Sequence, residues 1–206
     1  KNANFAWMQH IVSHLSSNGI GGCVMSNGSM NSDKNNEDVI RKAMVEDDLI
    51  DCMVLLPSKL FFSVSLSACL WFFAKPDHKK SKYRDRTGET LFIDARKLGK
   101  MIPGEKKHRE FPSSDIEKIV KTYHAWQGKP NSEKYKDITG FCKSVKIDKI
   151  RSKNYVLDSS NYVGFHEESS NIDYEKSIKE LSTQYVNCIN ESEKINKEIR
   201  KQLKDL

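Results

Sequence analysis

The sequence predicts an α/β protein with a sheet covered on both faces, followed by a long helix of different character. Two runs, 49–56 and 67–74, are apolar almost throughout, which is typical of strands buried on both faces of a sheet. They alternate with segments in which apolar residues recur at helical spacing. The 206 residues are 37% hydrophobic, which is enough for a core. The longest apolar stretch, 60–74, is broken by serines and is shorter than the roughly 20 residues of a membrane-spanning helix.

The first half of the chain is predicted to alternate helix and strand. Phe5, Met8 and Val12 recur at helical spacing and predict a helix over 3–17, which Asn18-Gly19 ends. After it we expect a strand over 19–25, a loop over 27–29 and a helix over 36–48. Two strands follow, over 49–56 and 67–74.

The next part is less apolar. Residues 76–87 and 99–109 are basic and predict loops, with a strand over 90–94 between them. Pro112-Ser113-Ser114-Asp115 predicts a helix start in which Ser or Asp caps the first amides. Short strand-like pieces follow at 141–145 and 155–157.

Residues 172–206 predict a long helix with a coiled-coil-like seam. Its seven Lys/Arg balance seven Asp/Glu, and its apolar positions follow a 4-3 spacing. So narrow an apolar stripe favours packing on another chain or another long helix. The alternative is a helix that lies on its own domain. The expected divisions are a sheet-bearing part (1–110), a mixed helical and strand extension (111–170) and a docking helix (171–206).

The motifs that would mark a chemical site are absent. The five cysteines are odd in number and form no Cys-x-x-Cys pair, which favours a reducing, intracellular compartment and no metal site. His10 and His14 lack the Glu of a zincin motif. Gly19-Ile20-Gly21-Gly22 precedes a strand, whereas a phosphate-binding loop follows one. Residue patterns alone therefore predict no catalytic centre.

Two features remain unusual. Phe61 and Phe62 lie in the loop between two buried strands. Both rings could complete the core, or they could form a platform that stacks on a nucleobase, a contact that contributes about 1–3 kcal/mol. The loops that follow are rich in lysine and arginine.

Several blocks of the chain, in order, resemble the modification (methylation) subunit of type I restriction-modification systems. They are Asn4–His10, Ser26–Ser29, Leu55–Phe62, Ala68–Phe72, Leu91–Gly99, Thr122–Trp126, Gly140–Ser144, Tyr155–Leu157 and Tyr162–Gly164. The resemblance implies the C-terminal half of a Rossmann-like class I methyltransferase sheet of seven strands, whose last strand is antiparallel. Residues 49–56 and 67–74 would form its terminal antiparallel hairpin, ahead of the long C-terminal helix.

The same resemblance implies an S-adenosylmethionine-dependent DNA adenine-N6 methyltransferase. In such enzymes an aromatic ring from the hairpin loop stacks on the flipped adenine; Phe61 matches that position best, and Phe62 is the second choice. The family's cofactor-binding segment and Asn-Pro-Pro-Phe motif are expected upstream, so this fragment should hold no catalytic residue and be inactive alone. The implied partners are double-stranded DNA, the specificity subunit, which the last helix would contact, and the restriction subunit, all in the cytoplasm.

The net charge of +6 is concentrated in one part of the sequence. Between residues 75 and 110 there are twelve Lys/Arg and six Asp/Glu, an excess equal to that of the whole chain. Lys79, Lys80, Lys82 and Arg84 are therefore candidate contacts to DNA phosphate, although merely solvated loops fit as well. The alternative to an enzyme fragment is a non-catalytic module that binds DNA through these loops and a partner through its last helix.

Overall fold

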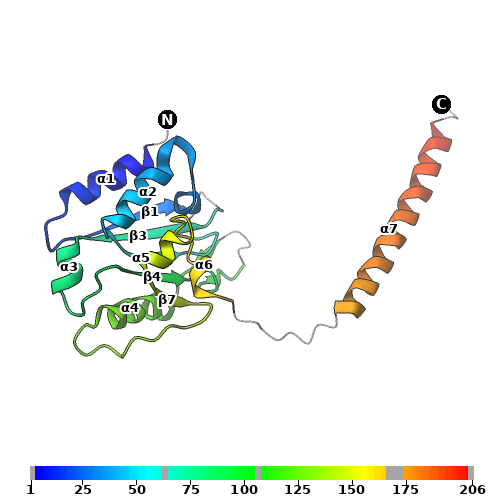
Figure 1. Ribbon diagram of the computed structural model, residues 1–206. Helices are drawn as coiled ribbons and strands as arrows, with labels where there is room; N and C mark the ends of the chain where they lie inside the picture. Colours follow the sequence, from blue (N-terminus) through cyan, green and yellow to red (C-terminus); the bar gives the residue numbers. More distant parts are fainter. Residues whose placement is uncertain (1–2, 62–64, 105–107, 166–173, 204–206) are drawn as a thin grey trace. The chain divides into compact units, whose positions relative to one another are not determined.

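The computed structural model describes residues 3–61, 65–104, 108–165 and 174–203. Contacts divide the chain into two units, Lys1–His166 and Glu167–Leu206. The first unit contains a sheet with helices on both faces, and the second is a single helix (Figure 1). No helix among the described residues is long and apolar enough to cross a bilayer.

The first unit is built on a five-stranded sheet in the order β1-β3-β2-β4-β7. β3 is antiparallel to both β1 and β2, β2 is parallel to β4, and β7 is antiparallel to β4. The expected hairpin is confirmed, because β2 and β3 are consecutive and adjacent. The strands are β1 (Ile20–Ser26), β2 (Ile50–Leu55), β3 (Ala68–Ala74), β4 (Glu89–Asp94) and β7 (Cys142–Lys146).

Helices cover both faces of this sheet, as the apolar strands predict (Figure 1). One face packs against α1 (Asn4–His14), α2 (Glu37–Glu46), α5 (Ile147–Arg151) and α6 (Ser160–Val163), and the other against α4 (Ser113–Gln127). All six residues of β2 are buried. Met53 and Leu55 belong to the first core and Cys52 and Val54 to the second, because successive side chains of a strand point to opposite faces. Segments 1–110 and 111–165 share one sheet, since β7 pairs with β4.

A helix replaces the loop expected over 76–87. α3 (Pro76–Ser81) begins with Pro76 at its first turn, where a missing N–H does no harm. Its buried residues are His78 and Lys79, so hydrophobic periodicity cannot detect it.

Three smaller expectations are also corrected. Residues 155–157 form no strand, because Asn154 and Tyr155 have positive φ values of 52° and 56° and turn the chain. The predicted loop over 99–109 contains a short hairpin, β5 (Lys100–Met101) paired with β6 (Arg109–Glu110). No side chain caps α4; Asp115 instead accepts a hydrogen bond from the N–H of Gly99 at 2.7 Å. Two 3₁₀ turns, Asn27–Met30 and Lys34–Asn36, complete the first unit.

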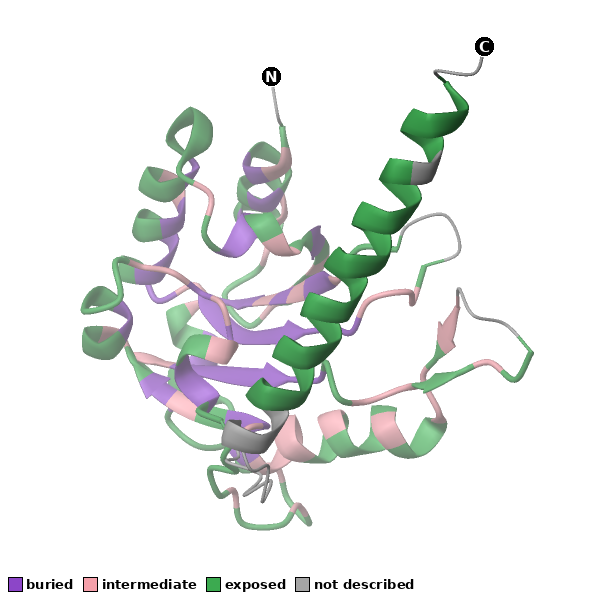
Figure 2. Cartoon of the chain, turned by 90° about the vertical axis from the view of Figure 1, so that its right-hand side faces the viewer, coloured by how far each residue is buried: buried purple, intermediate pink, exposed green. Residues whose placement is uncertain are grey.

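The second unit is α7 (Tyr174–Gln202), as predicted. Every α7 residue whose burial is described is exposed (Figure 2). The apolar residues of its seam share this exposure: Leu181 is 64% and Ile195 56% exposed.

Candidate nucleic-acid interface

The carboxyl ends of β2 and β4 lie at one edge of the sheet, because these two strands are parallel. β1 runs in the same direction, since both β1 and β2 are antiparallel to β3. We call this edge the carboxyl edge and the other the amino edge. Ligands of open α/β sheets bind outside the carboxyl ends of the strands, so the loops after these three strands form the candidate site.

Phe61 lies at the carboxyl edge, in the loop that follows β2. The residue is 42% exposed. Leu60, its neighbour, packs against the core cluster that contains Trp126 of α4. Lys59 has a positive φ of 66°. Phe61 therefore does not complete the core. Phe62 lies outside the described residues.

The β5–β6 hairpin lies beside this loop. The N–H of Arg109 donates to the carbonyl of Lys59 at 2.8 Å, and Met101 pairs with Arg109 across the hairpin. The N–H of Ala95 donates to the carbonyl of Leu55, also at 2.8 Å. These backbone bonds place the segment after β4 next to the segment after β2, although some forty positions separate Leu55 from Ala95.

An arginine is held in place at the same edge. Nε and Nη2 of Arg96 donate to the two carboxylate oxygens of Asp94, the last residue of β4, at 2.6–3.1 Å. The hydrogen bonds to Asp94 raise the pKa of Arg96. The Arg96 side chain is 45% exposed, and Nη1 has no hydrogen bond among the described residues. Sequence reasoning did not single out this residue.

The four predicted phosphate contacts lie at the amino edge, on the far side of the sheet from Phe61. The antiparallel strand β3 carries the chain away from the Phe61 loop, and α3 follows its end (Figure 1). β3 has seven residues, so the two loops are about 20 Å apart at roughly 3.3 Å per residue.

Lys79 is unavailable to DNA, which corrects one prediction. Its side chain is fully buried, and its ammonium group donates to Asp48 and to the carbonyls of Ile50 and Glu89. Burial lowers the pKa of Lys79, an effect that Asp48 opposes. Arg84 donates to Glu89 and to the carbonyl of Trp126, each at 2.9 Å. Lys80, Lys82 and Arg84 are exposed, so solvent exposure alone supports those three predictions.

A second buried charge network supports the amino edge. The side chains of Arg86 and Asp51 are both fully buried, with Nε and Oδ1 3.4 Å apart. The hydroxyl of Tyr123 donates to Asp51 at 2.5 Å, and the Arg86 guanidinium lies 5.3 Å from the ring centroid of Trp126. Burial and the Asp51 charge raise the pKa of Tyr123. The one sequence signal for this network is an Asp inside the apolar run 49–56.

The whole first unit matches one family model. The description of that family is N-6 DNA methylase, and the match covers residues 1–171. The chain belongs to this family. It is 40% identical over 203 residues to the type I restriction enzyme HindI methylase subunit of Haemophilus influenzae, a match that covers 98% of the chain and 43% of the relative. It is 35% identical to the MjaIX methylase subunit of Methanocaldococcus jannaschii, over 97% of the chain and 34% of the relative.

Solved structures agree with this family assignment. The methyltransferase subunit of a type I system from Streptococcus thermophilus is 28% identical and superposes with a TM-score of 0.65, over 79% of this chain and 30% of that one. The EcoKI M protein, 16% identical with a TM-score of 0.55, shares the fold. The resemblance to type I methylation subunits is confirmed, and the chain spans less than half the length of the curated relatives it matches.

The glycine-rich strand β1 of this N-6 DNA methylase chain does not form a cradle for S-adenosylmethionine. Gly21 lies within β1, and a Cβ added there would approach Cγ2 of Ile11 to 2.8 Å. This glycine therefore lets α1 pack on the sheet and does not form an open cradle. The sequence has no Asn-Pro-Pro triplet. The described residues also bring together no group of three His, Cys, Asp or Glu that could hold a metal ion.

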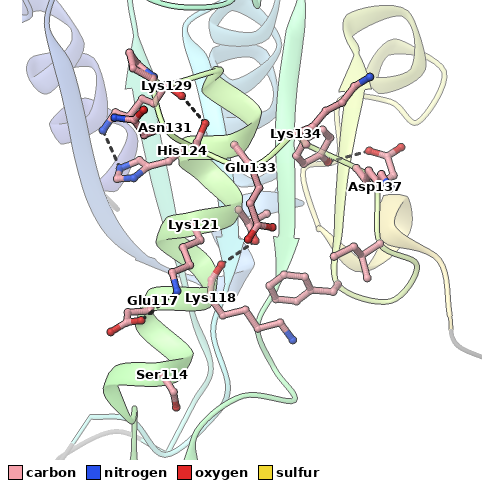
Figure 3. Close-up of a pocket in the computed structure, with 18 residues that line it drawn as sticks. Ser114, Glu117, Lys118, Lys121, His124, Lys129, Asn131, Glu133, Lys134 and Asp137 are labelled. Carbon is pink, nitrogen blue, oxygen red and sulfur yellow. Dashed lines mark hydrogen bonds and ion pairs between the residues drawn. The ribbon is translucent and has the colours of Figure 1, made fainter.

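A hollow of about 870 Å³ lies elsewhere, between α4 and the segment 129–138 (Figure 3). Several of its charges are already engaged. Lys121 lies 3.4 Å from Glu117, Lys129 donates to Nε2 of His124 at 2.8 Å, and Lys118 lies 4.3 Å from the Phe141 ring centroid. Phe61 and the four lysines and arginines predicted to contact DNA are not among its lining residues.

Proposed function

We propose that this chain is part of an S-adenosylmethionine-dependent DNA adenine-N6 methyltransferase, the methylation subunit of a type I restriction-modification system. The observation that carries the proposal is the half-exposed ring of Phe61 at the carboxyl edge, in the loop that joins β2 to the antiparallel β3. The N6 atom of adenine lies inside the stacked duplex, so the base must be flipped out before it can be methylated. An exposed ring beside the sheet is suited to stack on the flipped base.

The role we assign to this chain is to hold the base and not to carry out methyl transfer. S-adenosylmethionine would supply the methyl group. The sequence has no Asn-Pro-Pro triplet, and we infer that most of the family's cofactor-binding segment also lies outside this chain. We infer that other segments of a longer protein provide them and that the chain alone has no methyltransferase activity. We place that protein in the cytoplasm with its DNA.

Replacing Phe61 tests this role. In the full-length methylation subunit, Phe61→Ala should lower turnover about 5- to 150-fold, the equivalent of the roughly 1–3 kcal/mol that one stacked base contributes. Cofactor affinity should not change. Phe61→Tyr should keep most of the activity, because it keeps a ring.

Leu66→Ala is the matched control. Leu66 is an apolar residue of the same loop and is 72% exposed, so its loss tests whether any apolar contact in the loop suffices. Unchanged turnover in Phe61→Ala, or an equal loss in Leu66→Ala, would contradict the stacking role.

We further propose that α7 binds the specificity subunit, and that the restriction subunit joins the same complex. The apolar seam of α7 is exposed, and such a stripe is stabilised by packing against another helix. Deleting residues 172–206 should abolish co-purification with the specificity subunit, while Lys194→Gln, on the charged face, should not. Full stoichiometry after the deletion would contradict this role.

The non-catalytic module remains the second candidate, because α7 and the basic loops would serve it equally well. Membership of the N-6 DNA methylase family favours the enzyme. The gene sequence upstream of Lys1 decides between them: an Asn-Pro-Pro-Phe motif there supports the enzyme, and its absence supports the module.

A further inference from the structure

We propose that Arg96 and Lys100 bind the phosphate backbone of the DNA around the target base, and that Lys80 and Lys82 do not. The proposal rests on the proposed function, because it takes the carboxyl edge as the face that meets DNA. It replaces the phosphate contacts that the sequence predicted with a different pair of cations.

Arg96 has the geometry of a positioned cation. Two of its nitrogens are fixed by Asp94, which is itself only 10% exposed in its side chain. The guanidinium plane is therefore set by the end of β4, while Nη1 remains free among the described residues. Because an arginine held in this way loses little further side-chain entropy, it can donate to a phosphate oxygen at small cost.

Backbone hydrogen bonds connect the strand of Lys100 to the loop of Phe61. This strand, β5, pairs with β6, and β6 is bonded to Lys59, two residues before Phe61. Both residues of β5 are exposed. Glu110 lies directly opposite Lys100 and is exposed too, so it is the acidic neighbour that weakens this positive site.

The cations of the amino edge are poorly placed for the same DNA. They lie about 20 Å from the Phe61 loop, the length of β3 at roughly 3.3 Å per residue. Lys79 is buried, whereas Lys80, Lys82 and Arg84, which is paired with Glu89, are exposed. A duplex with its flipped base against Phe61 would meet Arg96 and the paired strands β5 and β6 first, because Arg109 of β6 is bonded to Lys59.

The salt dependence of DNA binding tests the proposal. Each lost phosphate contact should reduce the slope of log K against log salt concentration by about 0.9. In the full-length methylation subunit, measured with duplex DNA, Arg96→Gln and Lys100→Gln should each show this reduction. Lys80→Gln and Lys82→Gln, with the same loss of charge, should keep the wild-type slope. Glu110→Gln should tighten binding.

The outcomes separate this proposal from the stacking role of Phe61. Phe61→Ala should change turnover and not the salt slope. If Phe61→Ala leaves turnover unchanged, the stacking role fails, but the salt-slope test of Arg96 and Lys100 still stands. Arg96→Gln removes the partner of the Asp94 side chain, so misfolding could lower its affinity. Lys100→Gln controls for this, because Lys100 is exposed and its side chain forms no ion pair among the described residues. Wild-type slopes for both Arg96→Gln and Lys100→Gln would overturn the proposal, and so would equal reductions in Lys80→Gln and Lys82→Gln.

Discussion

Two basic segments lie on either side of β4; they have the same numbers of charged residues but differ in how far those residues are buried. Residues 75–89 and 94–110 each contain six Lys/Arg and three Asp/Glu. In the first segment the side chains of Lys79 and Arg86 are fully buried. In the second, Arg96 is 45% exposed in its side chain and Lys100 is exposed. Equal charge thus gives two buried cations beside the exposed Lys80, Lys82 and Arg84 at one edge of the sheet, and exposed cations at the other.

The difference comes from where the carboxylates lie. Asp48 and Asp51 lie at the start of β2, at the amino edge, and form ion pairs with the buried side chains of Lys79 and Arg86. A buried charge needs a partner and further hydrogen bonds to offset its lost hydration, and the carbonyls of Ile50 and Glu89 supply these for Lys79. At the carboxyl edge Asp94 engages Arg96 without burying it.

Removing one partner of the buried pair should have the largest effect. Asp51→Asn leaves the Arg86 guanidinium buried without a counter-charge, so the free energy of unfolding should fall by about 3–5 kcal/mol. Urea denaturation measures this as a lower midpoint at unchanged slope.

Two variants sharpen this result. Asp51→Leu combined with Arg86→Met removes both charges, so it should recover most of the lost stability. Lys80→Gln, in the same basic segment but exposed, should leave stability nearly unchanged. A loss of less than about 1 kcal/mol in Asp51→Asn, the range of an exposed pair, would show that the buried network does not support this edge.

The exposed pair between Glu46 and Arg151 should have the smallest effect, and that effect should depend on pH. The carboxylate of Glu46 accepts from Arg151 and from the hydroxyl of Tyr155, and these bonds lower its pKa from 4.5 to about 2. Since the folded-state pKa is depressed, the contribution is complete above pH 4.5 and is lost as pH falls towards 2. The melting temperature of Glu46→Gln should therefore lie slightly below wild type at neutral pH and converge with it in acid.

Asp47→Asn is the matched control for this pair. Asp47 is the exposed neighbour of Glu46 and forms no ion pair among the described residues. A pH-independent difference between Glu46→Gln and wild type would contradict the assignment.

The buried strands and the amphipathic helices could be predicted from sequence. Apolar runs marked β2 and β3, and helical spacing marked α1, α2 and α7, because burial of apolar side chains is the main source of stability of these elements. α3 could not be found in this way, since the side chains it buries are His78 and Lys79. The sequence pattern singled out Phe61 and Phe62 as a possible platform, and the resemblance chose Phe61. Its exposure is compatible with the proposed role.

The sequence by itself determined the family, the hairpin of β2 and β3 and the excess of positive charge. The tertiary structure decided which cations are accessible and at which edge they lie. The physical reason is that composition records how many charges a segment has, whereas the path of the chain decides which carboxylates they meet. The seven-residue antiparallel strand β3 ends at the amino edge, so the basic segment that follows it lies far from Phe61. β4 is parallel to β2 and ends at the carboxyl edge, so the basic segment that follows β4 lies near Phe61.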